Sequence, residues 1–216
     1  MRLKVIYDAR MPFRSAALPL LLLGLLTGCG LAVTSAGEMT SSSSPSRQPV
    51  SPVQGRWWTW AASEPESTNP VSDPTGKFCD RNQPQDVWFL AGTFGGTVQR
   101  TCQVPAGRPL AVPLVNWVAT KAECEAFLAD AKGEAVLDGK PVPPELLRDT
   151  DVLVTGVAGN PVTHEEGSFV SDACGLWVRL PPLEPGAHTL TIRGSSGGFA
   201  TGVDYTLIVL DQQQQL

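Results

Sequence analysis

Short apolar runs and alternating apolar and polar positions recur along the chain, separated by glycines and prolines. The clearest case lies between Cys79 and Cys102. Residues 87–91 form a continuous apolar run of strand length, and residues 97–104 alternate apolar or β-branched and polar side chains as a half-buried strand does. Three glycines between the two segments favour a tight reversal, because glycine accepts positive φ at little steric cost. The pattern predicts a β-hairpin at the centre of an all-β domain.

Further segments with the length and pattern of strands follow the hairpin. They are residues 109–118, 134–137, 151–157, 174–180, 188–193 and 203–210. Pro113 predicts an edge position or a bulge in the first of them, because proline cannot donate a ladder hydrogen bond. Residues 143–149 are predicted to form a proline-rich connection, and residues 158–172 a polar loop.

One segment has the pattern of a helix. Thr120 followed by Glu123 matches a capping box, and apolar residues recur at helical spacing from Cys124. Gly133 is predicted to end this helix at its C′ position. About eight strands with turn signals between most of them favour a sandwich over alternating strands and helices. We therefore predict a mainly β fold, a β-sandwich of about eight strands with one inserted helix.

The first thirty residues have the pattern of an export signal. Four basic residues precede the apolar stretch 16–26, which is shorter than the ~20 residues of a spanning helix. The stretch ends in Leu26-Thr27-Gly28-Cys29, which resembles a bacterial lipobox. The resemblance implies that signal peptidase II cuts before Cys29 and that its thiol carries diacylglycerol; the alternative is an ordinary signal peptide followed by a coincidental cysteine.

The segment after Cys29 is rich in serine and proline and cannot bury enough apolar surface to order itself. We predict a lipoprotein signal peptide at 1–28, a lipidated disordered tether at 29–54 and the β-sandwich domain at 55–211. The protein is expected to be exported and anchored through lipid to a bacterial membrane, on the extracytoplasmic side.

Charge narrows the range of partners. The chain has a formal net charge of -5; without residues 1–28, which hold four basic residues and one acidic residue, 12 basic and 20 acidic residues remain, a net charge of -8. An acidic chain without a basic cluster is a poor nucleic-acid binder, so no nucleic acid is expected as a partner. Anionic headgroups would repel it as well, so the membrane contact is expected through the lipid alone.

The chain has five cysteines. Assigning Cys29 to lipid leaves an even number in an exported protein, which favours disulfides. Three pairings are open, and proximity in the predicted hairpin favours Cys79–Cys102 with Cys124–Cys174. A zinc site is the competing interpretation, but the chain has no Cys-x-x-Cys pair and only two histidines, so no metal site is predicted.

Three tryptophans, Trp57, Trp58 and Trp60, fall within four positions. One hypothesis is an exposed aromatic platform that stacks on sugar rings. The alternative is a segment that closes one end of the core, because tryptophans bury large areas and often serve as packing anchors.

Glu165, Glu166 and Asp172 lie in the predicted polar loop 158–172 beside His164. They are candidate binding residues, since their carboxylates offer oxygen ligands or an acid pair for sugar hydrolysis. The alternative is a solvated loop, because neither calcium-loop nor zincin spacing is present.

Catalytic signatures are weak. Residues 194–198 match Gly-x-Ser-x-Gly around Ser196, but a nucleophile elbow needs a helix after the serine and a later histidine, and neither is predicted here. A glycine- and serine-rich loop between two strands explains the match better. The sequence predicts no catalytic residue and no cofactor.

The order of motifs resembles a group of secreted bacterial proteins of unknown function. The pieces that carry the resemblance are residues 87–92, the turn at 138–142 and the segment 183–189, and it spans roughly residues 57–210. It implies a fold and no chemistry.

Two hypotheses for function follow. The first is a non-catalytic binding or structural lipoprotein of the cell envelope, with a glycan or an envelope protein as ligand, bound by the loops at 63–86 and 158–172 or by the tryptophans. The second is an extracytoplasmic polysaccharide hydrolase or lyase. A concave face with two carboxylates would support the second hypothesis.

Overall fold

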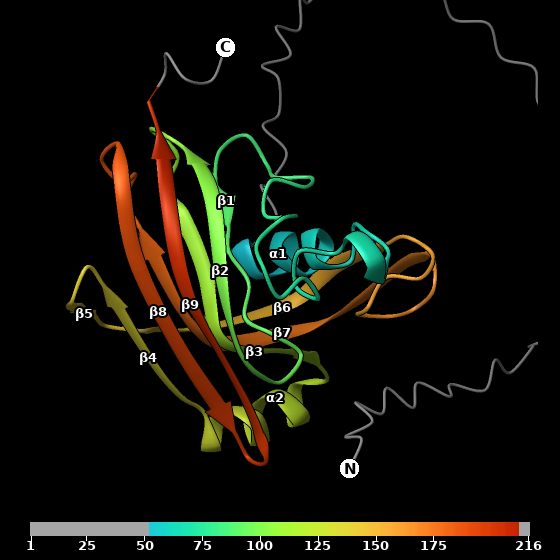
Figure 1. Cartoon of the computed structure of the whole chain (residues 1–216). Helices are drawn as coiled ribbons and strands as arrows, with labels where there is room; N and C mark the ends of the chain where they lie inside the picture. Colours follow the sequence, from blue (N-terminus) through green and yellow to red (C-terminus); the bar gives the residue numbers. More distant parts are fainter. Residues whose placement is uncertain (1–51, 212–216) are drawn as a thin grey trace, which may run out of the picture. The chain divides into compact units, whose positions relative to one another are not determined.

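Two β-sheets pack face to face, and one helix covers the outer side of the smaller sheet (Figure 1). The computed structural model describes residues 52–211. The sheet orders are β1-β3-β7-β6 and β2-β9-β8-β4-β5. The elements are α1 (Val53–Ala61), the 3-10 helix η1 (Glu66–Thr68), β1 (Trp88–Phe89), β2 (Gly96–Pro105), β3 (Leu110–Ala119), α2 (Lys121–Asp130), β4 (Lys132–Leu137), β5 (Lys140–Val142), β6 (Glu145–Gly156), β7 (Gly167–Leu180), β8 (Gly186–Ser196) and β9 (Phe199–Leu210). The predicted mainly β sandwich is confirmed, with nine strands in this part of the chain.

The core between the sheets comes from strand alternation. On β8, Leu190 and Ile192 are buried while the residues between and beside them are half-buried or exposed, and Val203 and Leu207 of β9 face the same interior. Burying each such side chain contributes about 1.5–3 kcal/mol, which makes the alternation the main determinant of which face turns inward.

A second core lies between α1 and the four-stranded sheet. Trp57, Trp60 and Phe89 pack there with Trp177 of β7, which is fully buried. The sequence analysis did not predict α1, which follows Pro52 and has no side-chain N-cap. The helix begins at Val53, two residues before the predicted start of the domain.

The predicted hairpin between Cys79 and Cys102 is wrong, because its two arms belong to different sheets. β1 pairs in parallel with β3, and β2 pairs in parallel with β9. The chain crosses from one sheet to the other after Leu90, and backbone groups at the crossing bond to side chains. The Tyr205 hydroxyl accepts from the Ala91 N–H and donates to the Ala91 carbonyl. Two partners distant in sequence thus outcompete the local reversal.

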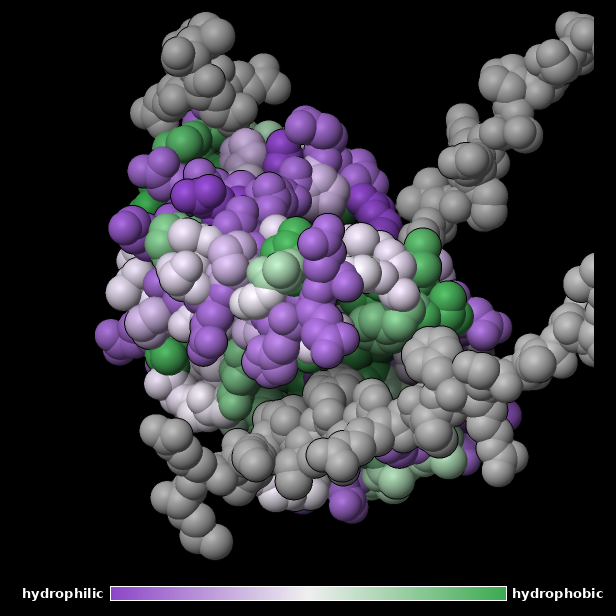
Figure 2. Space-filling model, turned by 90° about the vertical axis from the view of Figure 1, so that its right-hand side faces the viewer, coloured by the Kyte–Doolittle hydropathy of each residue, from purple (hydrophilic) through white to green (hydrophobic). Residues whose placement is uncertain are grey.

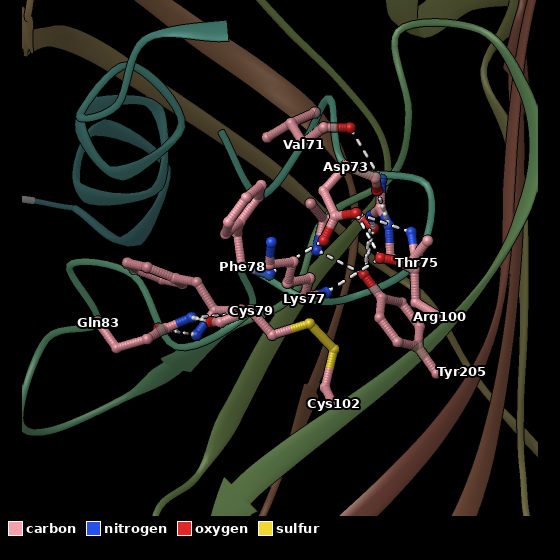
Figure 3. Close-up of a disulfide and its surroundings, with 12 residues drawn as sticks. Val71, Asp73, Thr75, Lys77, Phe78, Cys79, Gln83, Arg100, Cys102 and Tyr205 are labelled. Atoms are coloured by element: carbon pink, nitrogen blue, oxygen red, sulfur yellow. Dashed lines mark hydrogen bonds between the residues drawn. A yellow bond between two sulfur atoms is a disulfide. The ribbon is translucent and has the colours of Figure 1, made fainter. Parts of the chain in front are cut away.

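Arg100 joins this crossing to the loop that precedes β1 (Figure 3). The side chain is 2% exposed, and its guanidinium donates to the Tyr205 hydroxyl and to four backbone carbonyls. The carbonyls belong to Val71, Asp73, Ala91 and Gly92. Buried charge is tolerated only where its donors are satisfied, and this one has five partners.

Both predicted disulfides are confirmed. Cys79–Cys102 ties the loop before β1 to β2, and Cys124–Cys174 ties α2 to β7, with Cα–Cα distances of 5.7 and 5.8 Å. Because all four thiols are bonded to sulfur, they are not available as zinc ligands.

The capping box of α2 is confirmed. The Thr120 hydroxyl accepts from the Glu123 N–H, and the Glu123 carboxylate accepts from the Thr120 N–H at 2.9 Å. The predicted C′ glycine is wrong, because α2 ends at Asp130 and Gly133 belongs to β4. A Cβ at Gly133 would lie 2.9 Å from Leu114 Cδ1, so the glycine here serves close packing.

Two further boundaries differ from the sequence predictions. The predicted connection 143–149 belongs largely to β6, which begins at Glu145 and pairs with β7 on both sides of an irregularity between Asp149 and Val152. The predicted loop 158–172 is shorter, because β7 begins at Gly167. The bulge predicted at Pro113 is confirmed by a register shift between Pro113 and Val115.

Candidate functional site

The outer face of the five-stranded sheet is mostly polar, because its strands alternate buried apolar and outward polar residues. Cross-strand pairing aligns Thr97 of β2, Gly202 of β9, Arg193 of β8 and Glu134 of β4 in one row. The next row toward the start of β9 holds Ala200, Ser195 and Lys132, which are also aligned by pairing.

An open groove of about 440 Å³ crosses this face. It spans four neighbouring strands, from β2 to β4, a distance of roughly 14 Å at about 4.8 Å per strand. Its lining residues are Gly96, Thr97, Lys132, Gly133, Glu134, Arg193, Gly194, Ser195, Ala200 and Thr201. Half of these residues are glycine, alanine or serine, so little side-chain volume fills the space between the larger groups.

Gly202 sets the positions of two groove residues. A Cβ at this position would lie 2.9 Å from both Arg193 Cδ and Thr97 Oγ1. The Arg193 side chain therefore lies across the backbone of β9, where a larger residue would displace it. The absence of a side chain at Gly202 holds this part of the groove in its present shape.

The groove carries balanced charge. The Arg193 guanidinium donates to Asp204 Oδ1 at 2.7 Å and to the carbonyls of Ile192 and Val203. Its charge is therefore paired with a carboxylate of the same sheet. Among residues 52–211, the side chains of Lys132 and Glu134 have no hydrogen-bond or ion-pair partner. One free ammonium and one free carboxylate thus project from neighbouring outward positions of β4.

An exposed aromatic residue belongs to the segment that runs beside the β2 end of the groove. Phe94 is 42% exposed, in the short segment before β2. The segment is fixed to β9, because the Thr93 N–H donates to Thr201 Oγ1 at 2.7 Å and the Thr93 hydroxyl donates to the Gly96 carbonyl. Phe94 is therefore held beside two lining residues, Gly96 and Thr201.

The tryptophans predicted as a candidate binding platform are buried. Trp57, Trp58 and Trp60 are 3%, 7% and 3% exposed, and the indole N–H groups of Trp57 and Trp60 donate to the carbonyls of Leu90 and Arg81. The exposed-platform hypothesis is wrong for these side chains. The alternative, that they close the core, describes what α1 does.

The predicted acidic candidates do not meet. Glu165 and Glu166 are exposed in the loop between β6 and β7, whereas Asp172 lies within β7 and pairs in register with Ala119. Six residues of extended chain separate Glu166 from Asp172 by roughly 20 Å. The Asp172 carboxylate instead accepts from the Asp151 N–H at 3.3 Å. The three carboxylates therefore do not form one ligand set.

The hairpin of β6 and β7 exposes apolar side chains near that loop. Leu153 and Val170 pair across the two strands and are 52% and 59% exposed. Figure 2 shows this side of the molecule, with hydrophilic residues over its upper part and hydrophobic residues in the middle and to the right. Two paired side chains make a small apolar spot and define no groove.

Ser196, the serine of the nucleophile-like motif, has a structural partner. Its side chain is buried, and its hydroxyl donates to the Phe127 carbonyl of α2 at 2.7 Å. A tight turn and β9 follow it, and no helix does, as the sequence analysis expected. The residue therefore holds α2 against β8.

His188 and Asp138 bring together two of the sequence pieces that carried the family resemblance. His188 Nδ1 lies 2.7 Å from Asp138 Oδ2, and Nε2 lies 2.8 Å from the Glu184 carbonyl. The hydrogen bond to Asp138, followed by that to Glu184, raises the pKa of His188. The bonds from His188 and the Thr189 N–H lower the pKa of Asp138. In the protonated imidazolium form, both ring nitrogens donate to these two oxygens.

Other predicted features lie partly or wholly outside the described residues. Cys29, the signal peptide and most of the tether precede residue 52. Within residues 52–211, no group of three or more His, Cys, Asp or Glu side chains is placed to hold a metal ion. No helix in this range combines the length and apolarity needed to cross a bilayer.

The groove residues were missed by the sequence analysis. Alternation along β8 and β9 identifies which residues point outward, and this signal was available. Their assembly also requires the parallel pairing of β2 with β9, which places Thr97 beside Gly202 across a hundred residues of chain. Nothing in the local sequence indicates that pairing.

Comparison with known proteins gives little further information. No protein-family model and no curated protein matches the chain. A cysteine protease inhibitor from Entamoeba histolytica is 8% identical with a TM-score of 0.26, covering 56% of this chain and 94% of that one. A family 123 glycoside hydrolase from Clostridium perfringens is 13% identical with a TM-score of 0.24, covering 53% of this chain and 23% of that one. Likenesses at these TM-scores carry no argument about function.

Proposed function

We propose that the protein is an exported, membrane-anchored lipoprotein whose sandwich is a non-catalytic binding module of the cell envelope. The proposed export and anchoring rest on the basic leader, its apolar stretch and the lipobox-like end at Cys29. Two buried disulfides in the folded part agree with an oxidising compartment.

The observation that carries the binding role is the open groove on the outer face of the five-stranded sheet. Polar groups without internal partners line it, and the strands beneath it are fixed by long ladders between β2, β9, β8 and β4. A rigid sheet that leaves polar groups unused offers a preorganised surface, which lowers the entropic cost of binding.

The groove lies on the opposite side of the sandwich from α1. α1, the first described element, packs on the side of the four-stranded sheet opposite to the five-stranded sheet (Figure 1). The layers run from α1 through the two sheets to the groove. The groove and α1 therefore lie on opposite faces of the described part of the chain.

The anchoring is tested by mass spectrometry of the mature N-terminus. We expect a protein that begins at Cys29 with diacylglycerol on its thiol, and an uncleaved, unlipidated precursor for Cys29→Ala. A mature chain that begins elsewhere, or one with an unmodified Cys29, would overturn the lipoprotein assignment.

The binding role is tested by incubating the mature chain with isolated cell envelopes and measuring what sediments with them. Lys132→Ala/Glu134→Ala removes both free charged groups of the groove at no change in net charge. Lys121→Ala/Glu125→Ala makes the same charge change at exposed positions of α2, outside the groove lining, and serves as the matched control. We expect the groove variant alone to lose retention. Equal retention of all three proteins would contradict a role for the groove, and turnover of an envelope polysaccharide that depends on Glu134 would contradict the non-catalytic proposal.

A further inference from the structure

The charge balance of the groove limits the ligands that it accepts. Arg193 is neutralised by Asp204, and Lys132 and Glu134 contribute one free charge of each sign. The two free groups project from outward positions two residues apart on β4, roughly 7 Å along the strand. An anionic chain would meet one attraction and one repulsion within that distance, and a cationic chain would meet the same.

The hydrogen-bonding capacity of the groove side chains also favours a ligand without net charge. The Lys132 ammonium only donates, the Glu134 carboxylate only accepts, and the hydroxyls of Ser195 and Thr97 do both. A ligand that satisfies all four groups needs closely spaced donors and acceptors and no net charge. Hydroxyl groups along a sugar chain have this property, since each of them both donates and accepts.

The rim supplies the remaining contact that a sugar uses. Phe94 is 42% exposed, and its neighbour Thr93 is bonded to the lining residues Thr201 and Gly96, so the chain at Phe94 runs beside the β2 end of the groove. An aromatic ring buries the apolar face of a sugar while the hydroxyls at the sugar edge reach polar groups. The groove runs across four strands, so it is long enough for an extended segment of chain.

The geometry points to an uncharged polysaccharide as the ligand of this groove, bound across β2, β9, β8 and β4 with Phe94 at one end. This inference rests on the proposed binding function and names the chemical class of its ligand. The Lys132 ammonium and the Glu134 carboxylate then act as a donor and an acceptor to hydroxyl groups and form no ion pair with the ligand.

The test uses the mature chain and three kinds of immobilised polymer: neutral glucans and neutral chitin oligosaccharides, the anionic polymer alginate, and the cationic polymer chitosan. We expect retention on at least one neutral polymer, with less than about a twofold change in affinity between low and high salt, because no counterions are released. Lys132→Ala/Glu134→Ala should weaken binding by about tenfold or more, because two charge-assisted hydrogen bonds to the ligand are lost. Phe94→Ala should also weaken binding, because the aromatic surface that covers a sugar face is removed.

Gly202→Ala is a second variant that removes no polar group. Its methyl group would displace Arg193 and Thr97 and narrow the groove, so we expect weaker binding with an unchanged fold by circular dichroism. The control Lys121→Ala/Glu125→Ala, on the exposed side of α2, should bind as the unmodified chain does.

The outcomes separate the two proposals. Salt-dependent retention on alginate or chitosan that the groove variants abolish would overturn the neutral ligand and leave the binding function standing. Retention on cell envelopes through the groove, without binding to any of the neutral polymers, would do the same. Loss of retention on every polymer and on envelopes would overturn both.

Discussion

Replacing Gly194 by alanine tests a point of close approach between the two sheets. Leu114 lies in the bulge of β3, and its carbonyl faces Gly194 of β8. A Cβ at Gly194 would fall well inside contact distance of the Leu114 carbonyl oxygen and 2.9 Å from Val115 Cβ. Real Cβ atoms essentially never come within 3.0 Å of another heavy atom, so the strands would have to separate by about 1 Å.

The cost follows from what has to move. Overpacking a core typically costs about 1–3 kcal/mol, because side chains can adjust to relieve part of the strain. Here the closest atoms belong to the backbone of β3, which is held by its ladder to β7. We therefore expect a loss of about 3 kcal/mol in the free energy of unfolding for Gly194→Ala.

Gly198→Ala is the matched control in the next turn. A Cβ added at Gly198 would have no heavy atom within 4 Å, and the φ of this residue is not positive. Alanine there should change stability by less than about 1 kcal/mol, and in the stabilising direction, because it restricts the unfolded chain. Urea unfolding followed by tryptophan fluorescence measures both variants, and the slope with denaturant should stay the same. If Gly194→Ala unfolds within about 0.5 kcal/mol of Gly198→Ala, the close approach of β3 and β8 is not as described.

Three further predictions concern the contacts that hold the loops and turns. Cys124→Ser should lower the free energy of unfolding by about 0.7 kcal/mol more than Cys79→Ser in the loop-entropy model, because their bonds close segments of 50 and 23 residues. Equal losses of stability in urea unfolding would contradict this order. The pKa of His188 is raised, so the charged bond to Asp138 contributes fully to stability below about pH 6.5 and is lost as the pH rises through the folded-state pKa. His188→Gln should therefore flatten the fall of thermal stability above about pH 6.5. An unchanged pH profile would refute the contribution of this bond to stability. Arg100→Lys should cost more than about 3 kcal/mol in chemical unfolding, because buried carbonyls left without donors cost about 1–3 kcal/mol each, whereas a loss below about 1 kcal/mol would mean that these carbonyls find other partners.

Local patterns predicted the local features of this fold. The hydrophobic pattern predicted the central residues of strands β2, β7, β8 and β9 correctly, and the capping box predicted the start of α2 correctly. Both disulfides were predicted from cysteine parity and order, although the argument for the first relied on a hairpin that does not exist. Cys79 reaches Cys102 because the loop before β1 folds back onto β2.

The features that sequence reasoning missed depend on partners far along the chain. Three tryptophans within four positions fit an exposed strand, a buried strand or a helix, and only the surface offered by β6 and β7 decides for the helix. The parallel pairs β1–β3 and β2–β9 leave no turn signal, because their members are joined by long connections. The groove could not be predicted from the sequence for the same reason, because its residues come from four strands.

The loop around Cys79 covers one edge strand of each sheet, β1 and β2. The Gln83 side chain bonds to the N–H and the carbonyl of Phe89 as a neighbouring strand would, and also to the Cys79 carbonyl. On the other side of Cys79, the Thr75 carbonyl accepts from the Thr101 N–H of β2. Gly76, at φ +92, packs there against the Thr101 backbone, where any side chain would overlap it.

The Cys79–Cys102 disulfide therefore helps to keep two strand edges from pairing with other molecules. Uncovered strand edges pair readily with other chains, and here the same covalent bond holds the covers of both. Reduction of Cys79–Cys102 should be followed by self-association of otherwise folded molecules, visible as light scattering before tryptophan fluorescence reports unfolding. Reduced protein that stays monomeric until it unfolds would show that the loop keeps its place without the bond.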